Sequence, residues 1–325
     1  MSDLDSLSIL LIWTAIAIYA AAFVAYAFDL ARRSEMNADA RLVRSREAAL
    51  VGAGAGSTSG AVEASEPPAK PRYVMARIGT ALTGLGFVFH LAATILRGIA
   101  AERVPWANLY EFAMMGTLLI VLVYLLVLTR IDLRFLGTFI TGLVVVLMGA
   151  AAVSFYVGVV PLMYPLKSVW LVIHVFVATV ATAFFALACG LSVLQLMQSR
   201  RARRIEEGAE KTGPRFLATL PDADKLEGTA FRFAIVGFIL WTFTLIAGSI
   251  WAQDAWGRYW GFDVKETWTF IIWVLYAGYI HARATRGWRG NPSAWLSIIG
   301  FSAVLFNFTI VNVFFKGLHA YSGLS

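Results

Sequence analysis

The residues best suited to binding chemistry are concentrated between positions 248 and 268, GSIWAQDAWGRYWGFDVKETW. This segment carries the aromatic residues Trp251, Trp256, Tyr259, Trp260, Phe262 and Trp268. They alternate with the glycines Gly248, Gly257 and Gly261 and with the charged residues Asp254, Arg258, Asp263, Lys265 and Glu266. Flat aromatic faces stack on flat apolar ligands, and glycine lets the backbone approach closely. The pattern favours a ligand platform over its alternative, an aromatic anchor at a membrane interface.

Two of the four histidines flank this aromatic segment along the chain. His174 lies near the start of the apolar run 170–195, and His319 follows the last apolar run. Neutral imidazole is a common axial ligand of haem iron, and two imidazoles hold the iron from opposite faces. The pattern favours such a pair, placed above and below the aromatic platform. The alternative is that His174 is a hydrogen-bonded interface residue and His319 a tail residue.

The other two histidines lie deeper in apolar runs. His281 follows Lys265 by sixteen residues, which places it roughly 24 Å along a helix. An ionisable residue at that depth is a functional-site hypothesis, although nearby Arg283 also fits a position at the interface. His90 precedes Arg97 by seven residues, which places it about 10 Å below the outer end of its helix. His281 lies near the cytoplasmic side, so the two histidines differ in depth by roughly 10 Å in a bilayer core of ~30 Å. Axial ligands of one iron are nearly collinear, and His90 is therefore expected to be a structural or path-lining residue.

The elements that position these residues are predicted to be membrane-spanning helices. Of 325 residues, 59% are hydrophobic and 14% charged, whereas a soluble domain has about 25% charged residues. Apolar runs long enough to span a bilayer lie at 8–29, 74–96, 110–129, 135–155, 170–195, 232–251, 265–282 and 294–314. The fold class is therefore all-α, a polytopic membrane protein with about eight transmembrane helices. The single cysteine, Cys189, excludes a disulfide framework, a CxxC pair and a CxxCH site of its own.

Positive charge predicts the orientation of these helices. The net charge of +7 arises from 27 basic and 20 acidic residues, and twenty of the basic residues occupy alternate connections. By the positive-inside rule those connections are cytoplasmic and both termini are outside, which removes nucleic acid as the explanation for the charge. The composition, rich in Arg, Ala, Gly and Val, favours a bacterial plasma membrane.

The same pattern divides the chain into segments. Residues 1–29 are predicted to be an N-terminal transmembrane helix, and 30–73, with its small residues and prolines, a flexible cytoplasmic linker. Residues 74–325 form the main transmembrane domain, with a cytoplasmic loop at 198–231 and the outer aromatic loop at 248–268. The charged stretch 199–211 is compatible with a helix that extends the fifth span.

Several motifs resemble one family. The run from Trp256 to Asp263, WGRYWGFD, resembles the tryptophan-rich WGxxWxWD signature of the CcsA (ResC) family of cytochrome c biogenesis, and KETW follows it at 265–268. Phe262 stands where the signature has its third Trp, and Val264 where a Pro is usual. The resemblance extends to Pro105, to NLYE at 108–111, and to LKSVWL at 166–171 followed by His174. Arg103 stands where many members carry His.

The resemblance implies a haem-handling subunit of a two-subunit cytochrome c synthase, or haem lyase. It implies His174 and His319 as external ligands of haem b and His281 as an intramembrane ligand. A membrane partner of the ResB (CcsB) type would supply the second intramembrane ligand, and the CxxCH segment of apocytochrome c would accept the haem. Asp263 is then expected to order the loop or to pair with Arg258 or Lys265. Either cation is alternatively suited to a haem propionate.

Two alternatives belong to other classes. One is a bis-His electron-transfer subunit of a respiratory complex, which needs histidine pairs at matched depth on facing helices. The other is a transporter without haem, which predicts broken helices and polar residues at the membrane midplane. Asn307 and Asn312 are the clearest polar residues of that kind.

Overall fold

The computed structural model describes residues 2–53, 73–159, 167–209, 212–285, 288–315 and 317–318. Within these ranges the chain forms helices and turns, without strands. The α-helices are α1 (Ser2–Ala53), α2 (Val74–Ala101), α3 (Leu109–Leu128), α4 (Gly137–Ser154), α5 (Val169–Glu206), α6 (Ala223–Trp256), α7 (Val264–Ala284), α8 (Asn291–Phe308) and α9 (Ile310–Phe314). Short 3-10 helices lie at Arg134–Leu136 (η1) and Arg215–Thr219 (η3). The all-α expectation is confirmed.

Seven of these helical segments, within the described ranges, are long and apolar enough to cross a membrane. They belong to α1, α2, α3, η1 with α4, α5, α6, and α8 with α9. The predicted eighth span corresponds to α7, which has 21 residues but begins with Lys265 and Glu266 and ends near Arg283. α7 is not among the seven segments that are apolar enough by this measure. The protein is therefore a polytopic membrane protein with seven strongly apolar helices and α7 beside them.

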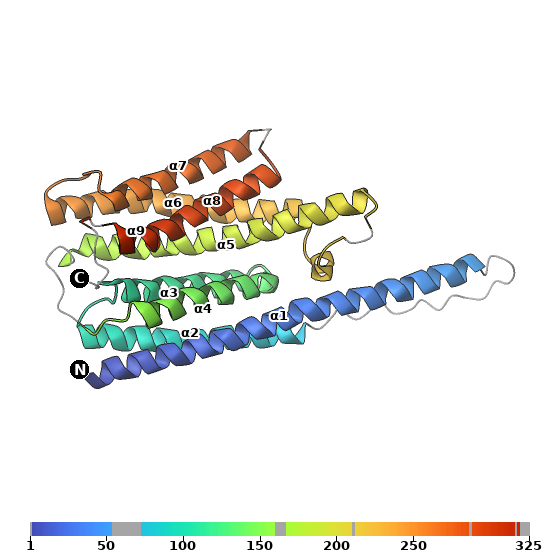
Figure 1. Cartoon of the computed structure of the whole chain (residues 1–325), viewed down its shortest axis with the longest axis horizontal. Coiled ribbons are helices and arrows are strands. Elements are labelled where there is room, and N and C mark those ends of the chain that lie inside the picture. The colour runs from blue at the N-terminus through green and yellow to red at the C-terminus, as the bar shows by residue number, and fades with distance from the viewer. Residues whose placement is uncertain are drawn as a thin grey trace.

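The helices lie side by side in alternating directions and form two layers (Figure 1). One layer holds α1 to α4, and the other holds α5 to α9. The layers meet where α3 packs against α5. The start of α1, the start of α5, the α6–α7 connection and α9 all lie at one end of the molecule. That end brings together the segments that the sequence singled out, and its assignment to the outer face is still a prediction from charge.

Three helix boundaries differ from, or extend, the expectations. The predicted linker is wrong for 30–53, because α1 continues to Ala53; this stretch is rich in Ala, Arg, Glu and Leu, which favour helix. Residues 54–72 lie outside the described residues. The predicted loop 248–268 is also too long, because α6 continues to Trp256 and the nonhelical part is 257–263. The charged extension of the fifth span, predicted for 199–211, is confirmed as far as Glu206, where α5 ends.

A buried ion-pair cluster fixes the connection between α2 and α3. Arg97 on α2 has no exposed surface and pairs with Glu111, also fully buried, at 2.9 Å, and with Asp5 of α1. Glu111 also accepts from Arg103 Nη1 at 2.7 Å and from the backbone N–H of Ala107 at 2.9 Å. Unpaired buried charges are costly, so each partner depends on the others. The cluster ties the starts of α1 and α3 to the end of α2, and gives Arg103 a structural partner.

Candidate functional site

His174 projects from the first turns of α5 toward α6. Ser168 caps α5 by accepting a hydrogen bond from the N–H of Trp170 at 3.2 Å. The His174 Nδ1 lies 2.9 Å from the backbone oxygen of Thr244. Because a carbonyl oxygen only accepts, Nδ1 carries the proton and the lone pair of the neutral ring is on Nε2. This is the arrangement by which metal-binding histidines are commonly oriented.

Two residues of α6 confine the imidazole. The ring of Trp251 is stacked at a centroid distance of 6.0 Å and an interplanar angle of 24°. Gly248 lies so close that a Cβ there would be 2.6 Å from His174 Cε1. The glycine is therefore required by the close approach of the ring, and α6 holds His174 from the side as well as through Thr244.

His174 lines two neighbouring cavities. Both cavities are also lined by Trp251, Lys265 and Thr269. The inner one lies between α3, α5, α6, α7, α8 and α9, with walls that include Trp106, Asn108, Phe112, Trp241, Asn307, Phe308 and Asn312. The other faces the aromatic loop and includes Tyr259, Trp260 and Glu266. The arrangement thus places one histidine, one lysine and several aromatic rings around a partly apolar space.

The described contacts of the aromatic residues of 248–268 fall into three groups. Trp251 is buried, and its ring contacts that of Trp256 at 4.8 Å; both pack with Trp106 and Trp170 beside the start of α5. A second group is formed by Tyr259, Trp260 and Phe262, whose residues are 62%, 36% and 82% exposed. Trp268 packs separately against Phe306 of α8 at 4.4 Å. In these contacts one group surrounds His174, one is exposed, and Trp268 joins two helices; a platform that binds a ligand is still a prediction.

The loop 257–263 has a tightly specified conformation. Gly257 ends α6 with φ of 71°, a left-handed conformation that suits glycine. Asp263 and Glu266 form a capping box at the start of α7. Glu266 also accepts from the N–H of Gly261 at 2.8 Å. Phe262 adopts φ of 56°, which is unusual for a bulky residue and costs energy. Glu266 thus fixes the loop backbone on both sides of Phe262 by accepting from Gly261 N and Asp263 N.

The two other described histidines, His90 and His281, lie away from this site. His90 on α2 is fully buried and lies 3.4 Å from the Tyr19 hydroxyl through Nδ1. His281 is exposed in the last turn of α7. Because α2 and α7 lie on opposite sides of the molecule (Figure 1), these two rings do not face each other. His319 lies outside the described residues, although the N–H of neighbouring Leu318 is 3.3 Å from Asp263 Oδ1.

Several residues at the site were not predicted as ligand contacts. The inner cavity is also lined by Trp106 of the α2–α3 connection, Asn108 at the cap of α3, Thr269 of α7, Asn307 of α8 and Asn312 of α9. For Asn307 and Asn312, the sequence signal of a binding site is that they are polar residues within an apolar run. Trp106 and Asn108 lie in the first connection at the same end, so their shared location with the aromatic loop was a second signal.

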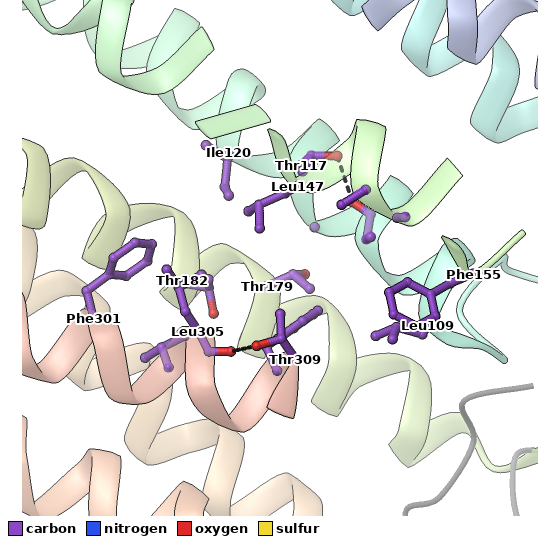
Figure 2. Close-up of a pocket in the computed structure, with 16 residues that line it drawn as sticks. Leu109, Thr117, Ile120, Leu147, Phe155, Thr179, Thr182, Phe301, Leu305 and Thr309 are labelled. Atoms are coloured by element: carbon purple, nitrogen blue, oxygen red, sulfur yellow. Dashed lines mark hydrogen bonds between the residues drawn. The ribbon is translucent and has the colours of Figure 1, made fainter. Parts of the chain in front are cut away.

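An apolar cleft extends from the inner cavity between the two layers (Figure 2). Leu109, Thr182, Val304 and Phe308 line both spaces. No charged residue is among the described residues that line the cleft, and Thr309 satisfies its hydroxyl by donating to Leu305 O at 2.7 Å. The site is therefore polar beside Lys265 and apolar toward α3 and α4.

The fold and the site define a polytopic helical membrane protein with an aromatic, histidine-containing site at one end of the bundle. Residues 106–319 match the family described as Cytochrome C assembly protein. The chain is 32% identical over 249 residues to the cytochrome c biogenesis protein CcsA of Heterosigma akashiwo (strain NIES-293 / 8280G21-1), covering 68% of this chain and 77% of that protein. It is also 32% identical to CcsA of Synechococcus elongatus (strain ATCC 33912 / PCC 7942 / FACHB-805), covering 75% and 87%. The chain belongs to the CcsA family of cytochrome c biogenesis proteins.

One solved structure shows the same fold. A chain titled Cytochrome c Heme Lyase CcmF superposes with a TM-score of 0.61 at 15% sequence identity. The match covers 94% of this chain and 46% of that one, so this protein spans about half the length of CcmF. At that identity the likeness concerns the fold. Together with the family, it makes this protein a multi-pass membrane subunit of cytochrome c biogenesis.

Proposed function

We propose that this protein is the haem-handling subunit of a cytochrome c synthase. It would present haem b at the His174 end of the bundle for covalent attachment to CxxCH of apocytochrome c. The observation that carries the proposal is the orientation of His174. Its Nδ1 is bonded to the Thr244 carbonyl, its ring is stacked near Trp251, and it lines cavities that also contain Lys265. An oriented neutral imidazole in an aromatic cavity is suited to hold haem iron.

The reaction requires positioning rather than a covalent nucleophile from this chain. Each thioether forms when a cysteine S–H adds across a haem vinyl group, with sulfur bonding to one carbon and hydrogen to the other. Fixing haem and peptide together makes such an encounter effectively unimolecular. Cys189 is buried in the core and lines neither cavity at His174, which agrees with a purely structural role.

His319 is proposed as the second external ligand. Support comes from its neighbours, because a Cβ on Gly317 would lie 2.2 Å from Asp263 Oδ1 and Leu318 donates to the same atom. Consecutive Cα atoms are about 3.8 Å apart. Leu318, the residue before His319, therefore lies beside Asp263, at the end of the loop that carries Trp260 and Phe262.

His281 is proposed as an intramembrane ligand that needs a second protein. It shares one exposed face of α7 with Phe270, Val274 and Gly278, at spacings of four, four and three residues. Glycine on such a face allows close helix approach within a membrane. The described histidines supply no facing ligand, so a ResB-type partner helix would provide it. The assembly is placed in a bacterial plasma membrane, with the His174 end outside, from composition and loop charge.

The alternative functions have less support at this site. An electron-transfer subunit needs two histidines at one haem within the spans, and neither His90 nor His281 lines the cavities beside His174. A transporter would use helices broken near the membrane midplane. Among the described spans, the clear interruption is at Thr309, close to the outer end predicted for α8 and α9.

The proposal is tested by co-expressing the chain with a ResB-type partner and a CxxCH reporter. His174→Gly is expected to lower covalent haem on the reporter at least tenfold and to change the low-spin spectrum of the purified complex. Added imidazole should restore the spectrum, because it replaces the missing ligand.

Phe176→Gly is the matched control. It introduces the same flexible residue two positions along α5, at a residue that is 50% exposed. This variant should retain the spectrum and the reporter haem. An unaltered spectrum in His174→Gly, or reporter haem that forms without this chain, would contradict the proposal.

A further inference from the structure

The inner cavity beside His174 has an unusual charge balance. Lys265 is the one charged residue among the described residues that line it. Its ammonium group donates to Asn312 Oδ1, a neutral partner. Asn312 is held by donating its Nδ2 to Phe308 O at 2.7 Å. No carboxylate is among the described lining residues of this cavity, although Asp263 lines a small neighbouring pocket with Lys265 and Asn312. Lys265 is therefore a cation in a wall of neutral polar and apolar residues.

Two asparagines add polar atoms that lack partners among the described residues. Asn108 is 5% exposed; its Oδ1 caps α3 by accepting from Glu111 N, whereas its Nδ2 is buried without a hydrogen bond. Asn307 is 6% exposed; its Nδ2 donates to Thr269 Oγ1, whereas its Oδ1 is buried without a hydrogen bond. Buried polar groups of this kind are normally satisfied by protein, water or ligand. Both residues line the same cavity as Lys265.

We infer that this cavity binds a carboxylate, and that the carboxylate is a propionate of the haem presented at His174. Lys265 and the Nδ2 of Asn108 supply donors for its oxygens, and a water bound to it can donate to Asn307 Oδ1. The inference rests on the proposed function and assigns the residues that recognise one edge of the ring.

The structure distinguishes Arg258 from Lys265, the two cations that the sequence offered as partners of a haem propionate. A Cβ on Gly261 would lie 0.5 Å from Arg258 Nη1, so this guanidinium group covers the loop backbone. Arg258 Nη1 is also 4.0 Å from Glu266 Oε2, and Arg258 lines neither cavity at His174. Lys265 lines both. Lys265 is therefore the propionate partner, and Arg258 is a loop residue.

A propionate held at Lys265 also determines the orientation of the haem ring. The two propionates lie on the edge of haem opposite the vinyl-bearing half of the ring. Holding a propionate at Lys265 directs the vinyl groups away from the α7–α9 wall. The reacting groups are then accessible to a peptide, while the charged edge is neutralised inside the protein.

The test compares two porphyrins in the purified complex with its partner. Iron protoporphyrin IX has free propionates, and its dimethyl ester has none. Equilibrium titration of the Soret band should show that the unaltered protein binds the diacid about tenfold to a hundredfold more tightly than the ester, as expected for a charge-assisted hydrogen bond. Lys265→Met should remove this preference while leaving the affinity for the ester unchanged.

A second variant guards against a purely structural effect. Asn108→Asp retains a good cap for α3 but replaces the Nδ2 donor by a carboxylate oxygen. This variant should lower the affinity for the diacid by about tenfold and leave the affinity for the ester unchanged. Lys225→Met is the control, because Lys225 is 75% exposed and pairs with Asp222 at the start of α6; it should retain the full preference.

The outcomes distinguish the inference from the proposed function. The propionate assignment would be overturned if Lys265→Met lowered the affinities for the diacid and the ester equally. It would also be overturned if the unaltered protein bound the two porphyrins with the same affinity. Competition by phosphatidylglycerol micelles that depends on Lys265 would instead identify a lipid phosphate as the ligand and also overturn it. Failure of the unaltered complex to bind either porphyrin as a low-spin species would contradict the haem function itself.

Discussion

At the scale of single residues, the site depends on contacts made by neighbours of His174, the proposed haem ligand. His174 is oriented by a backbone carbonyl of α6 rather than by an acidic side chain, and Gly248 provides the space for its ring. Such supporting contacts determine which nitrogen carries the lone pair. Changes next to His174 should therefore alter haem binding without removing the ligand.

Gly248→Ala tests this dependence. Alanine normally stabilises a helix relative to glycine by about 1 kcal/mol, but here its Cβ would meet the imidazole at 2.6 Å. The ring must move and lose its hydrogen bond to Thr244, so haem affinity should fall at least tenfold in a Soret titration.

Gly228→Ala provides the comparison on the same helix. A Cβ at Gly228 meets nothing within 4 Å, so this variant should bind haem normally and gain up to about 1 kcal/mol of stability. Equal haem affinities in the two variants would show that the close approach at Gly248 is unimportant.

At the scale of elements, hydropathy located the apolar core of each helix but not its ends. The end of α6 is determined by Gly257 in a left-handed conformation, and the start of α7 by the capping box of Asp263 and Glu266. α1 continues past the apolar run because its polar residues also favour helix. These local signals are short, and an apolar window of about 20 residues averages over them.

The connection between α2 and α3 depends on Glu111. Glu111→Gln removes the buried carboxylate that pairs with Arg97 and Arg103 and accepts from Ala107 N. Breaking a buried ion pair leaves its partners uncompensated, so the free energy of unfolding should fall by about 3–5 kcal/mol. Chemical unfolding in detergent, followed by circular dichroism, measures this change.

A surface ion pair gives the matched comparison. Glu207 is 3.6 Å from Arg203, and its side chain is 60% exposed. Glu207→Gln should change the free energy of unfolding by less than about 1 kcal/mol. If the two variants lose the same stability, the buried cluster does not hold this connection.

At the scale of the whole molecule, the two layers of helices leave one face of α7 exposed. Phe270, Val274, Gly278 and His281 lie on that face. In the proposed assembly a partner helix covers it and completes the coordination of haem at His281.

Gly278→Leu tests the partner contact. A Cβ at Gly278 meets nothing within 4 Å of this chain, so the larger side chain should leave the isolated fold intact while blocking close helix approach. Co-purification of the ResB-type partner should fall at least fivefold. Gly149→Leu on α4, another open position, should leave co-purification unchanged, and similar losses in both variants would contradict the proposed face.

The sequence by itself determined the all-helical membrane class, the family motifs and the small set of histidines. These features depend on composition and short-range pattern, which are properties of contiguous residues. Only the tertiary structure decided which side chains meet: Glu111 with Arg97 and Asp5, Lys265 with Asn312, and Trp251 with His174 while Trp268 packs elsewhere. The reason is that such contacts depend on how each helix is rotated and at what angle it crosses its neighbours. Both are determined when the side-chain ridges of one helix pack into the grooves of another.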